Sequence, residues 1–270
     1  MILKGKVAVV FGAGGFVGSA VARSFAQEGA KVYLGGRTIE KLQRVADDIT
    51  DAGGDATAVA VDATDESAVD QQVAALAADA GGLDITFNAI SYGDVQGAPL
   101  SELPPEHVLG PVDYALRTHL YTVRACARHI VQQGSGAVMT VTGYGPPFPE
   151  LGSTAITWHA VEGLYRQWAA ELGPHGVRVC WLRTGGFRES VLGAAAYDSL
   201  FMFSDGDLVP LSRLSGDTAE ADLAGIEQET MLKRLPSLAE AGATAAFLAS
   251  DHARSITATA VNLTSGAVAD

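Results

Sequence analysis

The chain of 270 residues is predicted to form one α/β domain, a doubly wound parallel sheet covered by helices on both faces. Short runs rich in β-branched residues alternate with helix-length amphipathic runs, which is typical of βαβ units. The first run, residues 6–11, leads directly into a glycine-rich turn at 12–18. No linker, repeat or low-complexity tract divides the sequence, so we expect a single domain over residues 1–270.

The first half is expected to contain four strands separated by helices. Val17, Val21 and Phe25 recur every fourth residue, as one face of a helix does, and Gly29 supplies a stop. Thr64 is predicted to cap a later helix whose positive end faces two acidic residues. The expected strands are 6–11, 32–34, 56–61 and 83–87, and the helix after the second strand is expected at about 38–50.

The second half repeats the pattern, with one exception. Helices are expected at about 112–133, 153–172 and 238–249, and strands at 137–141, 177–182 and about 260–263. The segment 187–230, rich in Gly, Ser and Asp with scattered apolar residues, fits neither period. A long excursion just after a strand end is usually a lid or substrate loop. A surface or oligomer-contact insertion is the alternative.

Charge and composition exclude several classes of function. The 18 basic and 31 acidic residues give a net charge of −13, so nucleic acid and anionic membrane surfaces would repel the chain. No apolar run approaches the length of a membrane span, and a strand expected from residue 6 leaves no room for a signal peptide. Cys126 and Cys180 lie in apolar or helical contexts that are typical of small core residues. We therefore expect a soluble, cytoplasmic protein.

The glycine-rich turn is suited to binding a dinucleotide. Gly12, Gly14, Gly15 and Gly18 lie between an expected strand and an expected amphipathic helix. Such a turn brings backbone N–H groups and a helix N-terminus to a pyrophosphate. A glycine pattern is weak evidence by itself, but this one stands in a βαβ unit of suitable size. A turn with only a structural role is the alternative.

Polar residues at the ends of successive strands add to this prediction. Arg37 follows the second strand, and no carboxylate at 34–36 is available for ribose hydroxyls, so NADP(H) with its 2′-phosphate is favoured over NAD(H). Asp62 ends the third strand and could accept a hydrogen bond from the adenine amino group, while Asn88 could brace the crevice. An exposed arginine without a ligand, and ordinary turn chemistry, are the alternatives.

Over nearly its whole length the chain resembles the short-chain dehydrogenase/reductase family. The resemblance rests on the order and spacing of motifs, namely Phe11–Gly18, Gly36-Arg37, Val61–Ala63, Asn88-Ala89, Ala125–Ile130, Gly134–Gly136, Ala160–Leu164, Ala170–Val179, Leu232–Leu235 and Phe247–Asp251. It implies a Rossmann-like domain that binds NAD(P)(H) and transfers hydride to or from a carbonyl or alcohol. The expected cofactor-binding residues are Gly12, Gly14, Gly15, Phe16, Val17, Gly18, Arg37, Asp62, Ala63, Asn88, Ala89 and Gly185.

The chain departs from the family at the glycine turn and at the catalytic residues. Phe16 stands at the family's usual middle glycine, although Gly12, Gly15 and Gly18 have the spacing of its extended branch. The positions that align with the family's catalytic Asn, Ser, Tyr and Lys are Ala115, Gly143, Thr154 and Trp158. A threonine hydroxyl is far too weak an acid and an indole does not titrate, so the family's proton relay cannot be carried over.

Three residues near these positions could take over part of the chemistry. Tyr144, on the loop expected to face the nicotinamide, could donate a proton or polarise an oxygen, and packing under neighbouring prolines is the alternative. Thr142 could replace the serine in polarising an oxygen. His119 lies one helical turn after the Asn position and could transfer a proton, with a packing or interface role as the alternative. The other histidines lack metal-ligand spacing, so no metal is expected.

The sequence therefore predicts a non-standard NADP(H)-dependent oxidoreductase. A non-redox enzyme such as a cyclase, dehydratase or isomerase in the same pocket, and a non-catalytic nucleotide-binding homologue, are the alternatives. Phe201, Met202 and Phe203 suggest a small-molecule substrate that is bulky and apolar. On the family resemblance, we expect a homodimer or homotetramer formed through the helices at 112–133 and 153–172.

Overall fold

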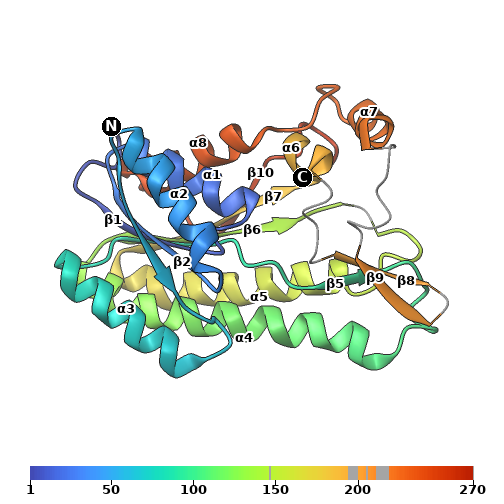
Figure 1. The fold of residues 1–270 in the computed structure, drawn as a ribbon, viewed down its shortest axis with the longest axis horizontal. Coiled ribbons are helices and arrows are strands. Elements are labelled where there is room, and N and C mark those ends of the chain that lie inside the picture. Colours follow the sequence, from blue (N-terminus) through green and yellow to red (C-terminus); the bar gives the residue numbers. More distant parts are fainter. Residues whose placement is uncertain (146, 194–199, 205, 211–218, 270) are drawn as a thin grey trace.

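The main sheet of the domain is parallel and seven-stranded, which confirms the predicted architecture (Figure 1). A computed structural model describes residues 1–145, 147–193, 200–204, 206–210 and 219–269. The strands run in the order β10-β7-β6-β4-β1-β2-β3, and neighbouring strands pair in parallel. Their bounds are β1 (Val7–Phe11), β2 (Lys31–Gly36), β3 (Asp55–Ala60), β4 (Ile85–Asn88), β6 (Gly136–Gly143), β7 (Val177–Thr184) and β10 (Thr259–Asn262).

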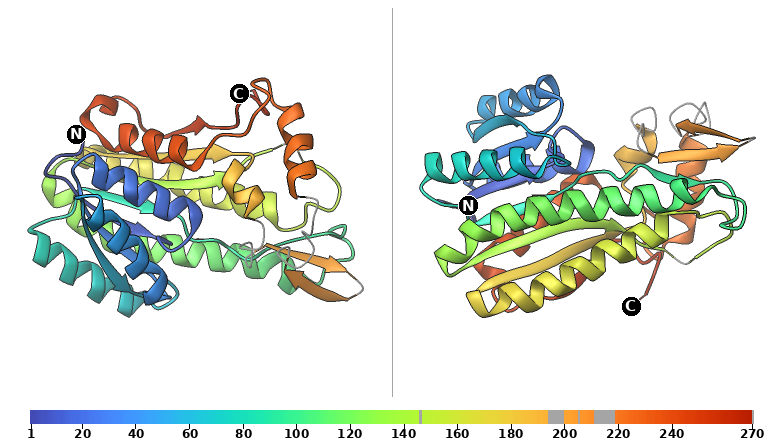
Figure 2. Two further views of the ribbon diagram at one scale, coloured as in Figure 1. Left: turned by 45° about the horizontal axis from the view of Figure 1, so that its top comes forward. Right: turned by 90° about the horizontal axis from the view of Figure 1, so that it is seen from below.

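Helices cover both faces of this sheet (Figures 1 and 2). One face carries α1 (Phe16–Gln27), α2 (Ile39–Asp51) and α8 (Leu238–Ala249), and the other carries α3 (Glu66–Ala80), α4 (Pro105–Ile130) and α5 (Thr154–Leu172). In β1, Val10 belongs to the buried cluster of the first face, whereas Val9 and Phe11 belong to that of the second. Because successive side chains point to opposite faces, a strand buried on both reads as a continuous apolar run.

Two predicted helix starts differ from the structure. The helix expected from residue 112 begins at Pro105, because proline is tolerated in the first turn, and Pro111 is accommodated inside it. A 3₁₀ turn over Val131–Gln133 follows α4. The predicted cap at Thr64 is wrong: Asp65 caps α3, and its Oδ1 accepts a hydrogen bond of 3.0 Å from the Ala68 N–H.

The segment 187–230 contains more regular structure than the sequence indicates. It holds α6 (Arg188–Leu192), β8 (Leu200–Ser204), β9 (Asp207–Pro210) and α7 (Ala219–Glu229), while its residues 194–199, 205 and 211–218 lie outside the described part. β8 pairs in parallel with β5 (Asp94–Gln96) and antiparallel with β9, which makes a separate three-stranded sheet. This sheet, α6 and α7 lie beyond the end toward which the main strands point (Figure 1).

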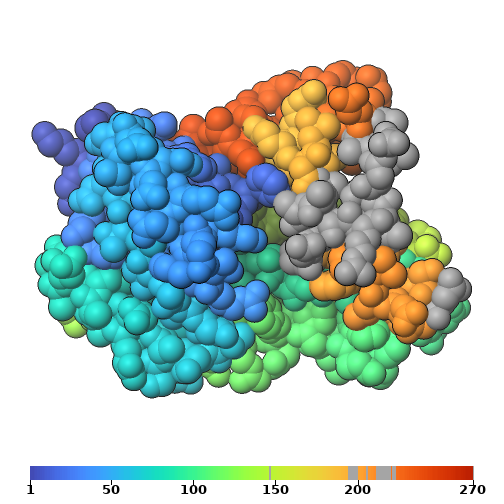
Figure 3. All heavy atoms as spheres, in the orientation of Figure 1, coloured from blue at the N-terminus to red at the C-terminus, as the bar shows by residue number. Residues whose placement is uncertain are grey.

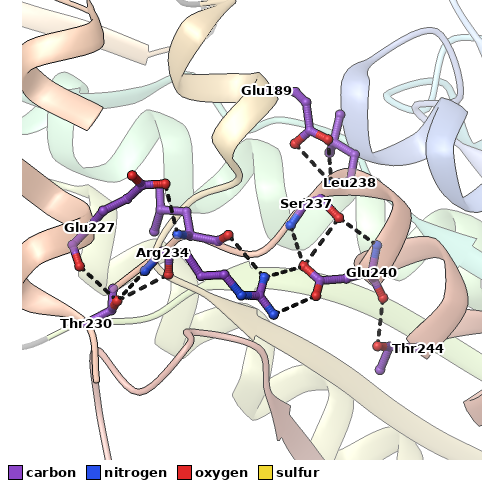
Figure 4. Close-up of polar contacts among 9 residues, drawn as sticks. Glu189, Glu227, Thr230, Arg234, Ser237, Leu238, Glu240 and Thr244 are labelled. Carbon is purple, nitrogen blue, oxygen red and sulfur yellow. Dashed lines mark hydrogen bonds and ion pairs between the residues drawn. The ribbon is translucent and has the colours of Figure 1, made fainter. Parts of the chain in front are cut away.

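Both ends of this segment are fastened to the start of α8 (Figure 4). Where the segment begins, the carboxylate of Glu189 accepts hydrogen bonds of 3.1 and 3.2 Å from the Leu238 N–H. Where it returns, Arg234 forms a bidentate ion pair with Glu240, with N–O distances of 2.7 and 2.8 Å. Glu240 also closes the capping box of Ser237 at the start of α8. The segment therefore leaves and rejoins the domain at one place.

Three further findings concern the chemistry available to the described residues. No helix among them is long and apolar enough to cross a membrane. Within the same residues, no group of three or more His, Cys, Asp or Glu side chains is placed to hold a metal ion. The two cysteines, Cys126 and Cys180, are unpaired and buried.

Replacing Gly18 by Ala is predicted to destabilise the fold. The new Cβ would lie 2.3 Å from the carbonyl oxygen of Gly12, so backbone would have to shift. We expect the free energy of unfolding, measured by urea denaturation, to fall by about 1–3 kcal/mol. Gly163→Ala is the matched control, because the Cβ added to that helical glycine meets nothing within 4 Å. The free energy of unfolding of Gly163→Ala should rise by about 0.5–1 kcal/mol. Equal stabilities of the two variants would contradict the steric argument.

Candidate active site

The sheet order reverses between β1 and β4, and the glycine-rich turn lies at this reversal. β1 leads to β2 and β3 on one side, whereas β4 leads to β6 and β7 on the other. Open α/β sheets bind ligands in the crevice at such a switch point. In Figure 3 a recess is visible beside the N-terminal elements, in blue, and below α6, in yellow.

Gly12 and Gly15 determine how closely a ligand can approach this turn. Gly12 has a φ of +73°, and a Cβ there would lie 2.4 Å from the carbonyl oxygen of Ala89, so the turn lies directly against the end of β4. Gly15 precedes α1 as its N-cap, and the described atom nearest to a Cβ at Gly15 would be the Gly12 oxygen, 3.4 Å away. The first N–H groups of α1 therefore remain approachable, as a phosphate group requires.

The other residues of the turn have different surroundings. Gly14 faces α2, because a Cβ there would lie 3.1 Å from Cβ of Lys41. Phe16 is 37% exposed, and a Cβ on Gly193 would lie 2.8 Å from the tip of its ring. Val17 packs against the buried cluster of the α1 face. The aromatic ring thus lies against the residue that ends α6, rather than inside the core.

Arg37 and Asp62 meet at the ends of β2 and β3. Arg37 is exposed and makes no hydrogen bond or ion pair with the described residues. The Asp62 Oδ1 accepts hydrogen bonds from the N–H and hydroxyl of Thr64, at 2.9 and 2.7 Å. These bonds, opposed by slight burial and helped by the charge of Arg37, lower the pKa of Asp62. Ala63 is buried beside this turn. The edge therefore presents a guanidinium next to an ionised carboxylate.

The buried side chain of Asn88 holds the end of β4 in place by hydrogen bonds. Its Nδ2 donates a hydrogen bond of 2.8 Å to the Thr122 hydroxyl of α4, and its Oδ1 accepts one of 3.1 Å from the Ile90 N–H. The N–H of Ala89 donates to the Phe11 carbonyl over 2.9 Å. These bonds fix the β4 end at the crevice, where an exposed glycine, Gly185, also follows the end of β7.

The structure shows the surroundings of the four positions that the sequence analysis predicted to align with a catalytic Asn, Ser, Tyr and Lys. Ala115 is fully buried in the core beneath α4. A Cβ on Gly143 would lie 2.1 Å from Cζ2 of Trp158, so the indole occupies the space that a serine side chain would need. Thr154 opens α5, and its hydroxyl oxygen accepts a hydrogen bond of 3.0 Å from Nε2 of Gln96 in β5. The changes at Gly143 and Trp158 are therefore sterically coupled.

A buried ion-pair network, which sequence reasoning missed, lies beside Thr142 and Tyr144. The carboxylate of Glu162 is paired with Arg183 at 2.6 Å and with Arg166 at 2.8 Å, and Thr142 donates a hydrogen bond of 3.3 Å to it. Burial raises the pKa of Glu162, but the two guanidinium groups outweigh this effect and lower it. Arg183 also lies 4.2 Å from the ring centre of Tyr144. The Thr142 hydroxyl is thus hydrogen-bonded to Glu162. The ring of the half-buried Tyr144 makes a cation–π contact with the Arg183 guanidinium.

His119 lies in the interior between α4 and α5. It is fully buried, and its Nδ1 shares a hydrogen bond of 3.1 Å with the hydroxyl of Tyr165. The Nε2 has no partner among the described residues. Burial lowers the pKa of His119 to about 3, so the ring is neutral at physiological pH. This geometry favours the packing role over proton transfer.

Asp94 is a second functional candidate that the sequence did not reveal. It opens β5, a strand too short to give an alternating pattern. Its side chain is partly buried, and its Oδ1 is inside the protein without a hydrogen-bond partner among the described residues. Burial raises the pKa of Asp94 to about 7, against the opposing effect of the Thr157 hydroxyl. A carboxyl group that titrates near neutrality therefore lies next to α5.

Asp94→Asn is predicted to change how stability depends on pH. Because the folded state holds the Asp94 proton more tightly than the unfolded chain, wild-type stability should fall as the pH rises from about 4 to about 7. The difference between this pKa and that of an ordinary aspartate corresponds to at most about 4 kcal/mol in the free energy of unfolding. Urea denaturation across this range should show that the free energy of unfolding of the variant increases relative to that of wild type as the pH rises. The exposed Asp48→Asn is the control, and a constant difference between Asp94→Asn and wild type would contradict the prediction.

Comparison with known proteins agrees with this architecture. Residues 12–221 match a family model described as enoyl-(acyl carrier protein) reductase. An uncharacterized oxidoreductase of Staphylococcus aureus (strain MW2) is 31% identical over 186 residues, which are 68% of this chain and 79% of that protein. A dehydrogenase/reductase from Sinorhizobium meliloti 1021, of known crystal structure, is 27% identical with a TM-score of 0.77, covering 99% of this chain and 96% of that one.

A second solved structure is similar over both chains. A short chain dehydrogenase from Burkholderia cenocepacia J2315, crystallised in complex with NADP, is 24% identical with a TM-score of 0.79 and covers 100% of each chain. This likeness concerns the fold. With the family match over residues 12–221, it leads to one conclusion: the chain belongs to the short-chain dehydrogenase/reductase family of oxidoreductases.

Proposed function

We propose that the protein is an NADP(H)-dependent oxidoreductase that acts on a carbonyl or alcohol through a non-standard active site. The observation that carries the cofactor preference is Arg37, an exposed guanidinium at the end of β2 without a partner among the described residues. No carboxylate precedes it at residues 34–36. A 2′-phosphate would supply a hydrogen-bonded ion-pair partner for Arg37.

The residues of the crevice fit such a cofactor. The N–H groups at Gly15 and the start of α1 would hold the pyrophosphate, and Arg37 the 2′-phosphate. Asp62, which is ionised and exposed, would accept a hydrogen bond from the adenine amino group. Val17 and Asn88 would act indirectly, because the first packs in the core and the second braces β4. The bound cofactor would supply or accept a hydride.

Tyr144 is the candidate for polarising the substrate oxygen. Thr142 is buried with its hydroxyl directed at Glu162, and His119 is buried and neutral, so neither is well placed to do this. Tyr144 follows β6 at the crevice edge and is only half-buried. The guanidinium of Arg183 lies 4.2 Å from the centre of its ring, which places a cation beside the phenol.

The segment 187–230 is suited to cover a bulky, apolar substrate. Phe201 and Phe203 of β8 pack with Val95 of β5, and Leu208 of β9 is 37% exposed. This hairpin lies beyond the end toward which the main strands point (Figure 1). We infer a lid function from this placement.

A homo-oligomer formed through α4 and α5 is also proposed. Exposed apolar side chains support it: Leu109 of α4 is 65% exposed, Leu120 is 37% exposed and Ile156 of α5 is 40% exposed. Apolar groups of this kind on adjacent helices are suited to contact a second subunit.

Arg37→Ala is expected to weaken NADPH binding much more than NADH binding. Loss of a charge-assisted contact to the 2′-phosphate should raise the Kd for NADPH by about 10- to 100-fold and leave that for NADH within about twofold. Cofactor fluorescence and thermal shift measure both. Arg44→Ala, at an exposed arginine of α2, is the control. Equal losses for the two cofactors would exclude contact with a 2′-phosphate, and failure of wild type to bind either would refute the proposed function.

Tyr144→Phe is expected to lower kcat for NADPH-dependent carbonyl reduction by about 10²-fold, because it removes one hydrogen-bond donor to the developing alkoxide. NADPH binding should not change. Turnover is measured on a panel containing an ortho-quinone, an aromatic ketone and an aliphatic aldehyde. Unchanged kcat would remove Tyr144 from the mechanism. NADPH binding without turnover of any carbonyl would favour the non-catalytic or non-redox alternative, which the indole packed on Gly143 also suits.

A further inference from the structure

Asp94 is positioned by contacts on both sides of β5. On one side, the N–H of Val95 donates to the Ser153 hydroxyl and its carbonyl accepts from the Ser153 N–H, both over 2.9 Å. On the other side, Asp94 pairs with Leu200 in the ladder to β8. Gly152 fits so closely that a Cβ there would lie 2.0 Å from the Val95 carbonyl oxygen. Asp94 therefore has a fixed backbone position.

This position places Asp94 along the first turns of α5, which carry two of the vacated catalytic positions. Gln96, on the same side of β5 as Asp94, bonds to Thr154 at the tyrosine position. The Thr157 hydroxyl lowers the pKa of the Asp94 carboxyl, and Thr157 directly precedes Trp158, the predicted lysine position. The carboxyl thus lies beside the part of α5 from which the family's proton relay has been lost.

Resting on the function proposed above, we propose that the carboxyl group of Asp94 donates the proton taken up by the substrate oxygen during carbonyl reduction. As the carbonyl carbon gains hydride, its C–O π electrons move onto oxygen. The O–H bond of Asp94 breaks, a new O–H bond forms at that oxygen, and Asp94 is left as a carboxylate that regains a proton from water. Oxidation of the alcohol reverses each of these changes.

The surroundings of Asp94 suit this role. Its Oδ1 has no hydrogen-bond partner among the described residues, so presenting it to a substrate oxygen breaks no existing bond. The groups that face it are Tyr92 from its own segment, Thr157 from α5 and Leu200 from β8, with His119 of α4 beyond the Tyr92 ring. Burial raises the pKa of Tyr92 and lowers that of His119, so all of these groups are neutral at pH 7.

The absence of a nearby cation among these groups explains why the acid keeps its proton. A carboxyl beside Arg or Lys ionises readily, whereas one in neutral, poorly hydrated surroundings stays protonated up to a higher pH. A proton donor works best when it titrates near the operating pH. Asp94 meets this condition, with a pKa of about 7, whereas the buried His119, with a pKa of about 3, does not.

Infrared spectroscopy of the free protein tests the protonation state without a substrate. At pH 6, the difference spectrum between wild type and Asp94→Asn should contain the carbonyl stretching band of a protonated carboxylic acid. This band should disappear as the pH rises, with a midpoint near the pKa of about 7. The exposed Asp48→Asn should show no such band. A spectrum with only ionised-carboxylate bands at pH 6 would overturn the proposal.

Kinetics test whether this proton is used. With NADPH and the fastest carbonyl of the panel, Asp94→Asn should lose about 10²–10⁴-fold in kcat while its Kd for NADPH changes less than twofold. Wild-type kcat/KM should fall as the pH rises through the pKa of Asp94, and the residual rate of the variant should lack this step. If Asp94→Asn has the kcat and the pH profile of wild type, the proposal is overturned and the proposed function is left intact. Wild type that binds no NADPH would overturn both.

Discussion

The close contact between Gly12 and the backbone of Ala89 fixes the geometry on which the rest of the site depends. It brings the end of β1 against the end of β4 with no room for a side chain between them. The start of α1, Arg37, Asp62 and the residues beyond β4 then open onto one edge of the sheet. A ligand held by the turn must extend along that edge, so the topology determines where its reacting end can lie.

The residues at the positions predicted to align with the catalytic ones are connected to each other and to β5. The indole of Trp158 fills the space beside Gly143, so a serine there is incompatible with this tryptophan. Thr154 is bonded to Gln96, which ties the start of α5 to β5. The same strand carries Asp94 and is held by β8 of the segment 187–230. Thr154 of α5, the three-stranded sheet and Asp94 are therefore linked through β5.

Much of the fold was predictable because parallel strands buried on both faces leave a strong signal. The bounds of α8 agree with the prediction, and the order of strands and helices follows directly from the alternation. Arg37 and Asp62 could be located because they lie within two residues of the ends of β2 and β3. β5 could not be predicted, because it has three residues between Gly93 and Gly97 and owes its form to pairing with β8.

The chemistry of the site depends on contacts between distant parts of the chain. The pKa of Asp94 is set by burial against α5, more than 50 residues later, and no local pattern records this burial. The contact of Trp158 with Gly143 depends on the path of the intervening loop. The place of His119 on a helix predicts a role in proton transfer. Burial among the surrounding side chains, however, lowers its pKa and keeps the ring neutral. Residue type and spacing could not supply these facts.

A crystal structure of the protein soaked with saturating NADP⁺ would show whether the crevice holds the cofactor. We expect 2′-phosphate oxygens within hydrogen-bond distance of Arg37, the pyrophosphate at the start of α1 and the nicotinamide ring on the Tyr144 side of the site. An empty crevice, or a Phe16 ring turned into the place of the pyrophosphate, would contradict this expectation.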